Sequence, residues 1–159
     1  EGCAQAGAAM TDQRYACKKP CKECPFSRTV TPGGTGGTEP EVYVGQAPGP
    51  FWLPCHLHTD FDDPEYRSDW TKPQCAGAAM YRNLVYPEVT FPPSLHKLEG
   101  DPELVFSSPA ELIAHHRQIP IEEAIALLDQ RGGVLPLFLR EMGRVQRGHT
   151  YGTPPREES

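Results

Sequence analysis

The clearest pattern of apolar and polar positions lies in the last third of the chain. The segment "SSPAELIAHH" places Ser108 where a helix N-cap is expected, with Pro109 at the first helical position and Glu111 three residues after the cap. This arrangement is typical of a capping box, in which the two side chains bond each other's backbone N–H groups. The sequence therefore predicts a helix that begins after Ser108 and ends before Pro120. The apolar side chains expected to face inward are Leu112 and Ile113.

Two more helices are predicted after this one. In "IEEAIALLDQRG" the apolar residues recur at intervals of three and four, which is the spacing of one face of a helix, and Gly132 is a favoured residue just past a helix end. A shorter helix is expected over residues 137–147. The predicted apolar stripe of the middle helix consists of Ile121, Ala124, Ile125 and Leu128.

The first two thirds of the chain carry little periodic pattern. Residues 29–41 hold four glycines and two prolines and are predicted to form a loop. Residues 41–47 alternate over too short a length to decide between a strand and one turn of helix. Residues 75–85 have helix-like spacing, whereas the proline-rich residues 86–106 are expected to form an extended connector.

This change of character predicts one domain with two halves. The fold class is expected to be a small α+β or irregular, metal-stapled domain, with a Pro/Gly-rich, cysteine-bearing N-terminal half and two or three short C-terminal helices. The N-terminal tail is interpreted as disordered or as an added remnant, with Met10 as the natural start. The predicted divisions are a tail over residues 1–16, a domain over 17–147 with halves 17–106 and 107–147, and a flexible tail over 148–159.

Composition indicates why such a domain needs a source of stability besides its apolar core. Hydrophobic residues make up 38% of the 159 residues, and there are 18 prolines and 15 glycines. A chain of this kind can bury only a modest apolar core, and a metal is a common additional source of order in small domains. The sequence therefore predicts that part of the folding energy comes from something other than apolar burial.

Charge and hydropathy limit the partners. The formal net charge is −6, and acidic residues are in excess in both halves. This charge does not favour nucleic acid or an anionic membrane as a partner. No apolar run approaches the length of a membrane span. We therefore expect a cytoplasmic protein that binds another protein, with nucleic acid as the less favoured partner and no membrane association.

Four of the six cysteines are candidate metal ligands. Cys21 and Cys24 are separated by two residues, a spacing that lets both sulfurs reach one ion or one cluster. Cys55 and Cys75 follow singly along the chain. Without a secretory signal, these cysteines are interpreted as metal ligands rather than as disulfide partners. The predicted ligand set is Cys21, Cys24, Cys55 and Cys75.

The residues that follow these cysteines favour a [4Fe-4S] cluster. Pro25 comes directly after Cys24, as in iron–sulfur ligand runs, where its fixed φ turns the chain away from the cluster. Gly77 lies two residues after Cys75 and would let the backbone approach a sulfur and donate an N–H bond to it.

Zinc is the alternative metal. Structural zinc sites usually have two compact pairs of ligands, whereas here the second pair is split. A histidine from "CHLH" could replace a cysteine ligand in such a site. His56 is also a candidate donor of a hydrogen bond to a ligand sulfur, or a polar loop residue.

A third interpretation uses a different set of sulfurs. Cys17, Cys21 and Cys24 have the three-then-two spacing of radical S-adenosylmethionine enzymes. Those enzymes carry an aromatic residue before the third cysteine, where this chain has Glu23, and they need a barrel of strand–helix units that this sequence does not predict. Cys17 is therefore interpreted as a spare thiol.

The cysteine motifs together resemble a set of small bacterial and phage-encoded proteins of unknown function. The segments that carry the resemblance are "CKECPF", "VGQAPGPFWLPCH", "PQCAGAAMYRN" and "SSPAELIAHH". The shared pattern is Cys-x2-Cys-Pro, then Cys-His, then Cys-Ala-Gly, and the resemblance covers most of residues 17–145. It implies that the same four cysteines form the site and leaves Cys3 and Cys17 as extras. It implies no reaction.

The remaining polar and aromatic residues suggest no catalytic site. His115 and His116 are interpreted as residues that suit the C-terminal dipole of their helix. The basic residues of the last helix are interpreted as a solvated face. Aromatic residues near the cysteine motifs are expected to shield the metal from water. Those residues are Arg140, Arg144 and Arg147 for the basic face, and Phe51, Trp52 and Trp70 for the shield.

The sequence thus predicts a small four-cysteine metal-binding protein with no catalytic residues. The metal is expected to be a [4Fe-4S] cluster with a mainly structural role in an interaction or regulatory module. The alternatives are a redox, electron-transfer or sensing iron–sulfur protein and a zinc-binding interaction module.

Overall fold

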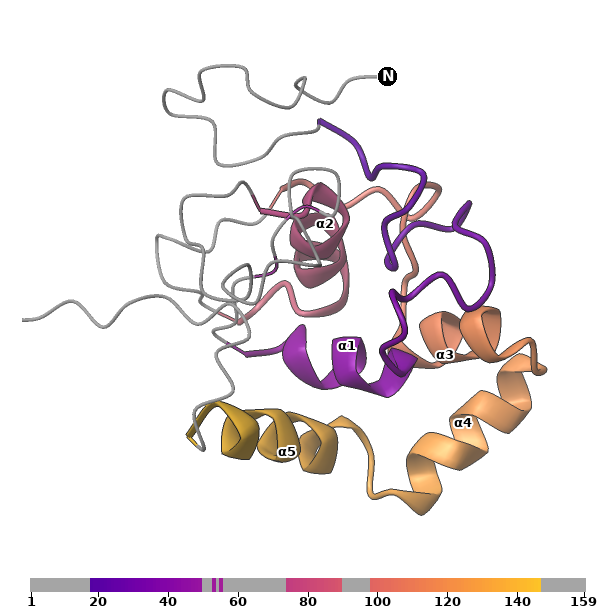
Figure 1. Ribbon diagram of the computed structural model, residues 1–159, viewed down its shortest axis with the longest axis vertical. Coiled ribbons are helices and arrows are strands. Elements are labelled where there is room, and N and C mark those ends of the chain that lie inside the picture. The colour runs from indigo at the N-terminus through magenta and orange to yellow at the C-terminus, as the bar shows by residue number, and fades with distance from the viewer. Residues whose placement is uncertain (1–17, 50–52, 54, 56–73, 90–97, 147–159) are drawn as a thin grey trace, which may run out of the picture.

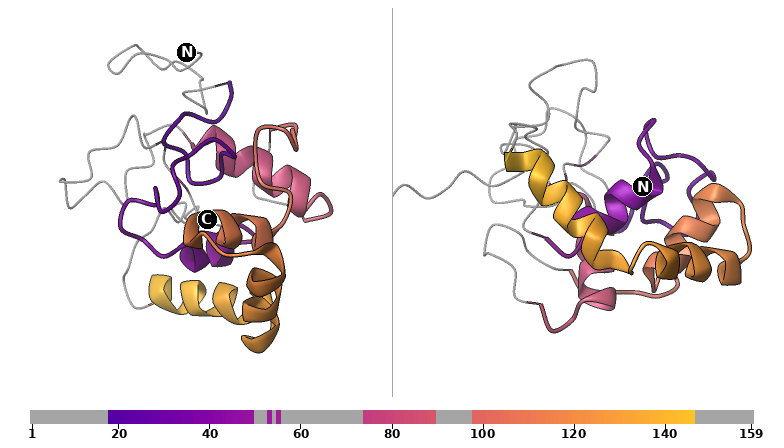
Figure 2. Two further views of the ribbon diagram at one scale, coloured as in Figure 1. Left: turned by 90° about the vertical axis from the view of Figure 1, so that its right-hand side faces the viewer. Right: turned by 90° about the horizontal axis from the view of Figure 1, so that it is seen from below.

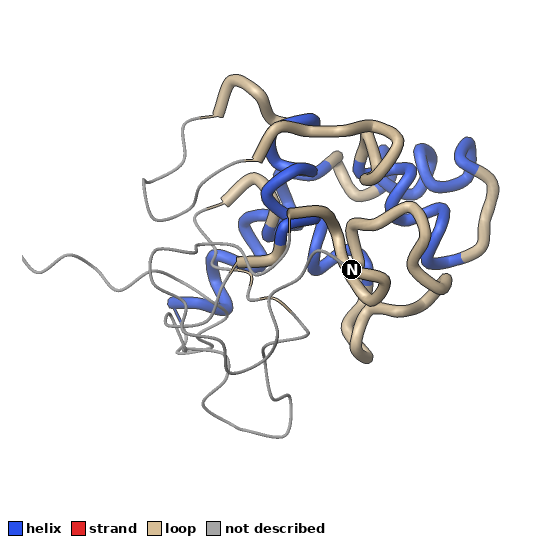
Figure 3. Tube along the Cα trace, turned by 90° about the horizontal axis from the view of Figure 1, so that it is seen from above, coloured by secondary structure: helices blue, strands red, loops and turns tan. Residues whose placement is uncertain are grey.

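The computed structural model describes residues 18–49, 53, 55, 74–89 and 98–146. Within these ranges the chain forms five helices and no strand, joined by long loops (Figures 1 and 3). An isolated antiparallel bridge pairs Ser27 with Val105. The helices are α1 (Pro40–Gln46), α2 (Ala76–Val85), α3 (Pro109–Arg117), α4 (Ile121–Gln130) and α5 (Val134–Gln146).

These elements match the coarser part of the predicted fold class. A small irregular domain with three short C-terminal helices is confirmed, and the described ranges supply no strand for the α+β alternative. The ambiguous segment after residue 40 is helical, since α1 begins with a proline at its first position. Almost every residue of α1 is buried, which explains why its sequence shows no amphipathic period.

The start of α3 follows the predicted cap in part. The Ser108 hydroxyl accepts a hydrogen bond from the Glu111 N–H at 3.1 Å. The Glu111 carboxylate, however, accepts from the Ser107 N–H at 2.9 Å rather than from the N–H of Ser108. It also pairs with the Arg28 guanidinium at 2.8 Å. The second half of the predicted capping box is therefore replaced by a contact that ties α3 to the cysteine-bearing half.

The inward face of α3 is as predicted, whereas that of α4 is not. Leu112 is 0% exposed and Ile113 is 1% exposed. On α4 only Ala124 is buried, and Ile121 and Ile125 are exposed. The predicted apolar stripe of α4 is therefore covered at Ala124 and exposed at Ile121 and Ile125. The period of a sequence defines an apolar face, but it does not provide a neighbour to cover it, and α4 extends along the edge of the domain (Figure 1).

Helix α1 is the centre of the helical half, because both α3 and α5 pack against it. Figure 2 shows α5 alongside α1 from two further sides. Gly45 of α1 meets the backbone of Leu137 so closely that a Cβ atom at Gly45 would lie 2.6 Å from its carbonyl oxygen. This close approach requires glycine. None of the helices in the described ranges is long and apolar enough to cross a membrane.

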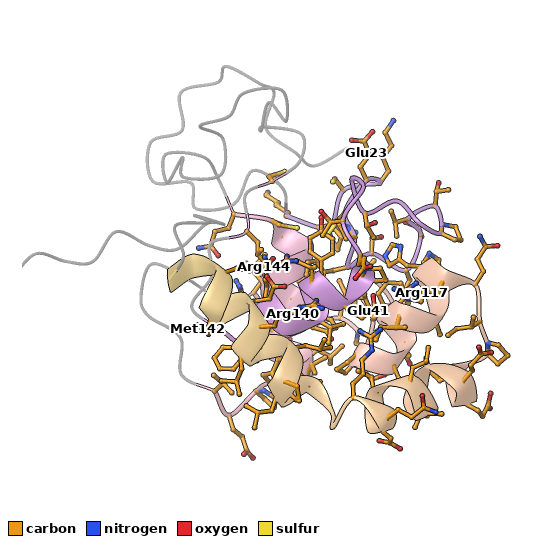
Figure 4. All side chains as sticks on the ribbon, turned by 60° about the horizontal axis from the view of Figure 1, so that its bottom comes forward. Glu23, Glu41, Arg117, Arg140, Met142 and Arg144 are labelled. Carbon is orange, nitrogen blue, oxygen red and sulfur yellow. The ribbon has the colours of Figure 1, made fainter. Side chains whose placement is uncertain are left out.

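Two carboxylates of the helical half are buried, and the first of them joins α1 to α3. Glu41 of α1 is 2% exposed, and both of its oxygens accept hydrogen bonds from Arg117 of α3 at 2.7 Å (Figure 4). Glu141 of α5 is 1% exposed and lies between Arg140, at 3.6 Å, and Arg144, at 3.4 Å. The sequence predicts Arg140 and Arg144 on a solvated face. In the structure both side chains are partly exposed, and they flank the buried carboxylate of Glu141.

The core joins the helical half to the cysteine-bearing half. The ring of Phe26, two residues after Cys24, lies 5.1 Å from the ring of Tyr81 on α2. Tyr81 and Leu112 of α3 belong to the same buried cluster. Arg82 is 0% exposed, and its Nε donates to the Ala47 carbonyl at 3.0 Å. The core therefore places the cysteine loop, α2 and α3 against one another.

Candidate metal centre

The first two cysteines lie on consecutive turns. The N–H of Cys24 donates to the Cys21 carbonyl at 3.0 Å, and the N–H of Ser27 donates to the Cys24 carbonyl at 3.0 Å. The two-residue spacing therefore forms a tight turn, as expected for paired ligands. The turn is followed by Phe26, whose burial anchors Cys24 in the interior.

Helix α2 positions the other two cysteines. Cys75 is the N-cap of this helix, and its sulfur accepts from the Ala78 N–H at 3.5 Å. The backbone N–H of Cys75 donates to the Leu53 carbonyl at 2.7 Å. Because Leu53 is two residues before Cys55, this bond brings the segment of Cys55 to the start of α2.

The four sulfurs meet as two pairs. The sulfur of Cys24 lies 3.2 Å from the sulfur of Cys75, although the two residues are 51 positions apart. The thiol of Cys21 is hydrogen-bonded to Cys55. Cys24, Cys55 and Cys75 are buried, whereas Cys21 is half-buried. Three separate segments of the chain thus bring their sulfurs to one place at the edge of the core.

Gly77 lies in the first turn of α2 against this site. A Cβ atom at Gly77 would overlap the sulfur of Cys24. The backbone N–H of Gly77 also bonds to Cys75. The position therefore requires a residue without a side chain so that the helix can approach both sulfurs.

Hydrogen bonds shift Cys21 toward its charged form. The bond from Cys55 is the main cause, and it lowers the pKa of the Cys21 thiol from 9.0 to about 6, against the opposing effect of partial burial. The backbone N–H of Glu23 bonds to the same residue, while the nearby Glu23 carboxylate opposes the shift. Because the thiolate is the form that binds metals, this shift prepares Cys21 for ligation.

The pKa values of the two thiols of the buried pair shift in opposite directions. The hydrogen bond from Cys24 is the main cause that lowers the pKa of Cys75, and the N–H groups of Ala78 and Gly77 lower it further. Burial is the main cause that raises the pKa of Cys24. Backbone N–H groups directed at cysteine sulfur are a common feature around metal-bound thiolates.

Two histidines of α3 hold the cysteine loop in place. His116 Nε2 lies 2.8 Å from the Pro25 carbonyl oxygen, and its Nδ1 accepts from the Gly33 N–H at 3.2 Å. Since Nδ1 accepts, the proton of the neutral ring is on Nε2, which donates to Pro25. His115 Nε2 lies 2.6 Å from the Val30 carbonyl oxygen. These bonds join α3 to the loop on both sides of Phe26.

Sequence reasoning assigned His115 and His116 to the helix dipole and missed these contacts. A signal was present, because His116 follows Leu112 by four residues and Ile113 by three, which places it on the inward face of the helix. An inward histidine needs buried hydrogen-bond partners. The identity of those partners, 83 and 91 positions away, has no local signal.

Several predicted site residues lie outside the described residues, and the predictions about them stay predictions. They are the extra cysteines Cys3 and Cys17, the histidine candidate His56, and the aromatic residues Phe51, Trp52 and Trp70. The basic side chain of Arg147 lies outside the described residues as well.

The sulfurs of the four candidate ligands are not arranged around a single metal position. Among the residues that the structure describes, no group of three or more histidine, cysteine, aspartate or glutamate side chains is arranged to hold one metal ion. The 3.2 Å between Cys24 and Cys75 is shorter than the roughly 3.8 Å expected between two thiolates on one tetrahedral zinc. Metal binding would therefore have to move the paired sulfurs apart, while the donor set itself suits a thiolate-binding metal.

The chain was compared with protein-family models, curated proteins and solved structures. None of the three comparisons finds a match. The candidate site therefore rests on the sequence pattern and on the geometry of this chain alone.

Proposed function

We propose that this protein binds a metal through Cys21, Cys24, Cys55 and Cys75, and that the metal has a mainly structural role in an interaction or regulatory module. The observation that carries the proposal is that four sulfurs from three segments meet in two contacting pairs, with three of them buried. Cysteines from distant segments that gather in this way are typical of a metal site or of a disulfide. A metal bonded to all four would cross-link three segments that are distant in the sequence.

The structural role is supported by how the segments around the site are ordered. The loop that carries Cys21 and Cys24 contains no helix or strand before α1. Apart from its cysteines, it is anchored by Phe26, by the bridge to Val105 and by side-chain contacts with α3 from Arg28 and the two histidines. Because metal–thiolate bonds contribute directly to folding in small domains, the metal is the missing organising element of this half.

A [4Fe-4S] cluster is the first candidate for the metal. Pro25 after Cys24 is the sequence feature that favours it. In such a cluster each cysteine binds a different iron, so the four sulfurs need not converge on one point. When bound, the cluster would supply four iron–thiolate bonds and the capacity to exchange one electron.

Zinc is the second candidate, and one distance favours it. The 3.2 Å between the sulfurs of Cys24 and Cys75 is nearer to the spacing of two thiolates on one ion than to the wider spacing that a cluster imposes. A zinc site would have the same structural role but no redox chemistry.

The redox alternative is favoured by the exposure of one ligand. Cys21 is half-buried, so the centre would be open to solvent on that side. An electron-transfer or sensing centre needs such an approach, whereas a purely structural centre does not. The described residues contain no second cofactor motif to which an electron could pass.

The interaction role is proposed from the surface of the helical half. Leu135 and Leu139, one turn apart on α5, are 63% and 57% exposed, and Ile125 of α4 is 47% exposed. Exposed apolar side chains in such number are common where a protein contacts a partner. We propose α5 as the element that meets a protein partner, as an alternative to the proline-rich segment over residues 86–106.

Circular dichroism before and after metal removal tests the structural role. The aerobic protein is compared with protein from which the metal has been lost by chelation or oxidation, alongside a redox titration. We expect loss of the metal to reduce helix content and to unfold the cysteine-bearing half. Retained structure together with reversible reduction by dithionite and reoxidation by air would instead support the redox alternative.

A further inference from the structure

The four thiols of the centre differ in their access to solvent. Cys24, Cys55 and Cys75 are 1%, 2% and 8% exposed, whereas Cys21 is only half-buried. A reagent that approaches from solvent therefore meets the sulfur of Cys21 first. The buried thiols can react only after Cys21 has reacted or after the fold has opened.

The contacts between sulfurs do not follow the order of the sequence. In a motif with two intervening residues, such as Cys21 and Cys24, oxidation is expected to join the two cysteines of the motif. Here the sulfur of Cys24 faces Cys75 at 3.2 Å, whereas Cys21 packs against the small buried cluster of Cys55 and Ala76 and is hydrogen-bonded to Cys55. A disulfide needs its sulfurs at about 2.05 Å, so sulfurs already in contact need the least movement.

We propose that Cys21 and Cys55 form a regulatory disulfide when the protein meets a low-molecular-weight disulfide, and that this disulfide releases the metal. The inference rests on the proposed four-cysteine centre and concerns the regulation of that centre. Oxidation removes two of the four ligands, one from the turn that carries Cys24 and one from the segment of Leu53. Cys24 and Cys75 remain as a reduced, buried pair, and two thiolates are too few to retain a four-coordinate metal.

The reaction is a thiol–disulfide exchange in two steps. The Cys21 thiolate attacks one sulfur of the oxidant RSSR, which forms a mixed disulfide on Cys21 and expels RS⁻. The sulfur of Cys55 then attacks the sulfur of Cys21, which forms the protein disulfide and expels the second RS⁻. In total, two protein thiols are oxidised and one RSSR is reduced to two RSH, which take up the two thiol protons.

The test uses the full-length chain with Cys3→Ser and Cys17→Ser, so that only the four site cysteines remain. One sample is purified without oxygen and keeps its metal, and a second is reduced and stripped with a chelator. Both are incubated with oxidised glutathione, and the disulfides are mapped by peptide mass spectrometry. We expect Cys21–Cys55 as the main product in both samples, and release of metal from the first sample in step with its formation.

A main product that joins Cys21 to Cys24, or no protein disulfide at all, would overturn the proposal. The stripped sample reports the pairing even if the purified chain contains no metal, so failure of the metal centre and failure of the disulfide are distinguishable.

Two single variants test the order of the steps. Cys55→Ser removes the resolving thiol, so glutathione should stay attached to Cys21. Cys75→Ser is compared in the stripped, metal-free sample, because it also removes a ligand; it takes a thiol from the buried pair and should still give Cys21–Cys55. Glutathione on Cys24 rather than on Cys21 in the Cys55→Ser chain would contradict the proposed entry point. If Cys55→Ser does not fold, the disulfide map of the chain that keeps all four site cysteines decides.

Discussion

Gly77 of α2 lies directly against the sulfur of Cys24, so closely that a Cβ atom at this position would overlap the sulfur. The contact joins the first turn of α2 to the turn that carries Cys21 and Cys24. Glycine in a helix usually costs stability, because it has more conformational freedom to lose on folding than alanine. Its presence here therefore indicates that close approach to the sulfur outweighs that cost.

Gly77→Ala is expected to weaken the centre. The same change at an open helical position would stabilise the protein by up to about 1 kcal/mol. Here the added methyl group must displace the sulfur of Cys24, and overpacking of this kind costs about 1–3 kcal/mol. Displacement of a ligand should also lower metal affinity by about 10-fold or more. Metal analysis and urea denaturation measure the two effects.

Asn83→Ala is the matched control for Gly77→Ala. Asn83 lies in the same helix and is only partly buried. Its replacement should leave metal content unchanged and alter the free energy of unfolding by no more than about 0.5 kcal/mol. A Gly77→Ala protein that is more stable than the parent and keeps its metal would contradict the packing account.

Serine at each of the four site cysteines tests the ligand set. Cys21→Ser, Cys24→Ser, Cys55→Ser and Cys75→Ser should each lower metal content and soluble yield, because a chain with a modest core depends on the site for folding. Cys3→Ser and Cys17→Ser should behave like the parent. Loss of the metal in Cys17→Ser, with retention in Cys75→Ser, would instead restore the three-then-two ligand set.

The stability of the protein should fall as the pH drops below the ordinary pKa of histidine. Burial is the main cause that lowers the pKa of His116 from 6.5, with a further effect from the neighbouring His115. A second proton on His116 would place an N–H against the N–H of Gly33, which now donates to the ring. Since the unfolded chain binds this proton more readily than the folded chain, stability is full above about pH 6.5 and is lost below it.

The loss should reach at most about 1.4 kcal/mol per pH unit, and urea denaturation at several pH values above about 5 measures it. His116→Gln removes the titrating ring and should flatten this dependence, although it lowers stability at every pH. An unchanged pH dependence in His116→Gln would show that another group is responsible.

The ion pair between Glu41 and Arg117 should contribute more than a surface pair. Glu41 is almost fully buried and accepts two hydrogen bonds from Arg117, so Arg117→Gln would leave a buried carboxylate without its cation. Because Arg117 itself is partly exposed, we expect a cost of roughly 1–3 kcal/mol in urea denaturation at neutral pH. Glu123→Gln, at an exposed site on α4, should change stability by no more than about 0.5 kcal/mol.

Acid should remove the same contribution. Burial alone would raise the pKa of Glu41, but the hydrogen bonds from Arg117 and the adjacent charge outweigh it, so the net shift is downward from 4.5. The folded state therefore holds this proton less tightly than the unfolded state, and the contribution is lost as the pH falls below about 4.5. If Arg117→Gln had the same acid sensitivity as the parent, the ion pair would not be its cause.

Local signals in the sequence predicted the presence of three helices in the C-terminal half, although α5 begins earlier and is longer than the short helix expected over residues 137–147. The Ser108 cap and Pro109 define the start of α3 through bonds within a few residues, so they need no knowledge of the rest of the fold. The exposed stripe of α4 was not predicted, because exposure depends on which elements pack nearby. The histidine bonds to Pro25 and Gly33 were missed for the same reason.

The site shows the same division between local and distant information. Spacing singled out Cys21 and Cys24, and the tight turn between them is local. The contact of Cys24 with Cys75, and of Cys21 with Cys55, is set by how α2 and the segment of Leu53 pack together. Four cysteines permit more than one pairing, and the sequence contains nothing that selects among them.

The metal content of the full-length protein purified without oxygen tests the central claim most directly. The account predicts either about four iron and four sulfide per chain with a brown colour, or about one zinc per chain without colour. A chain in which all four site cysteines are serine should contain neither. A correctly folded parent protein that contains no stoichiometric metal, with all four thiols free to react after unfolding, would contradict the account.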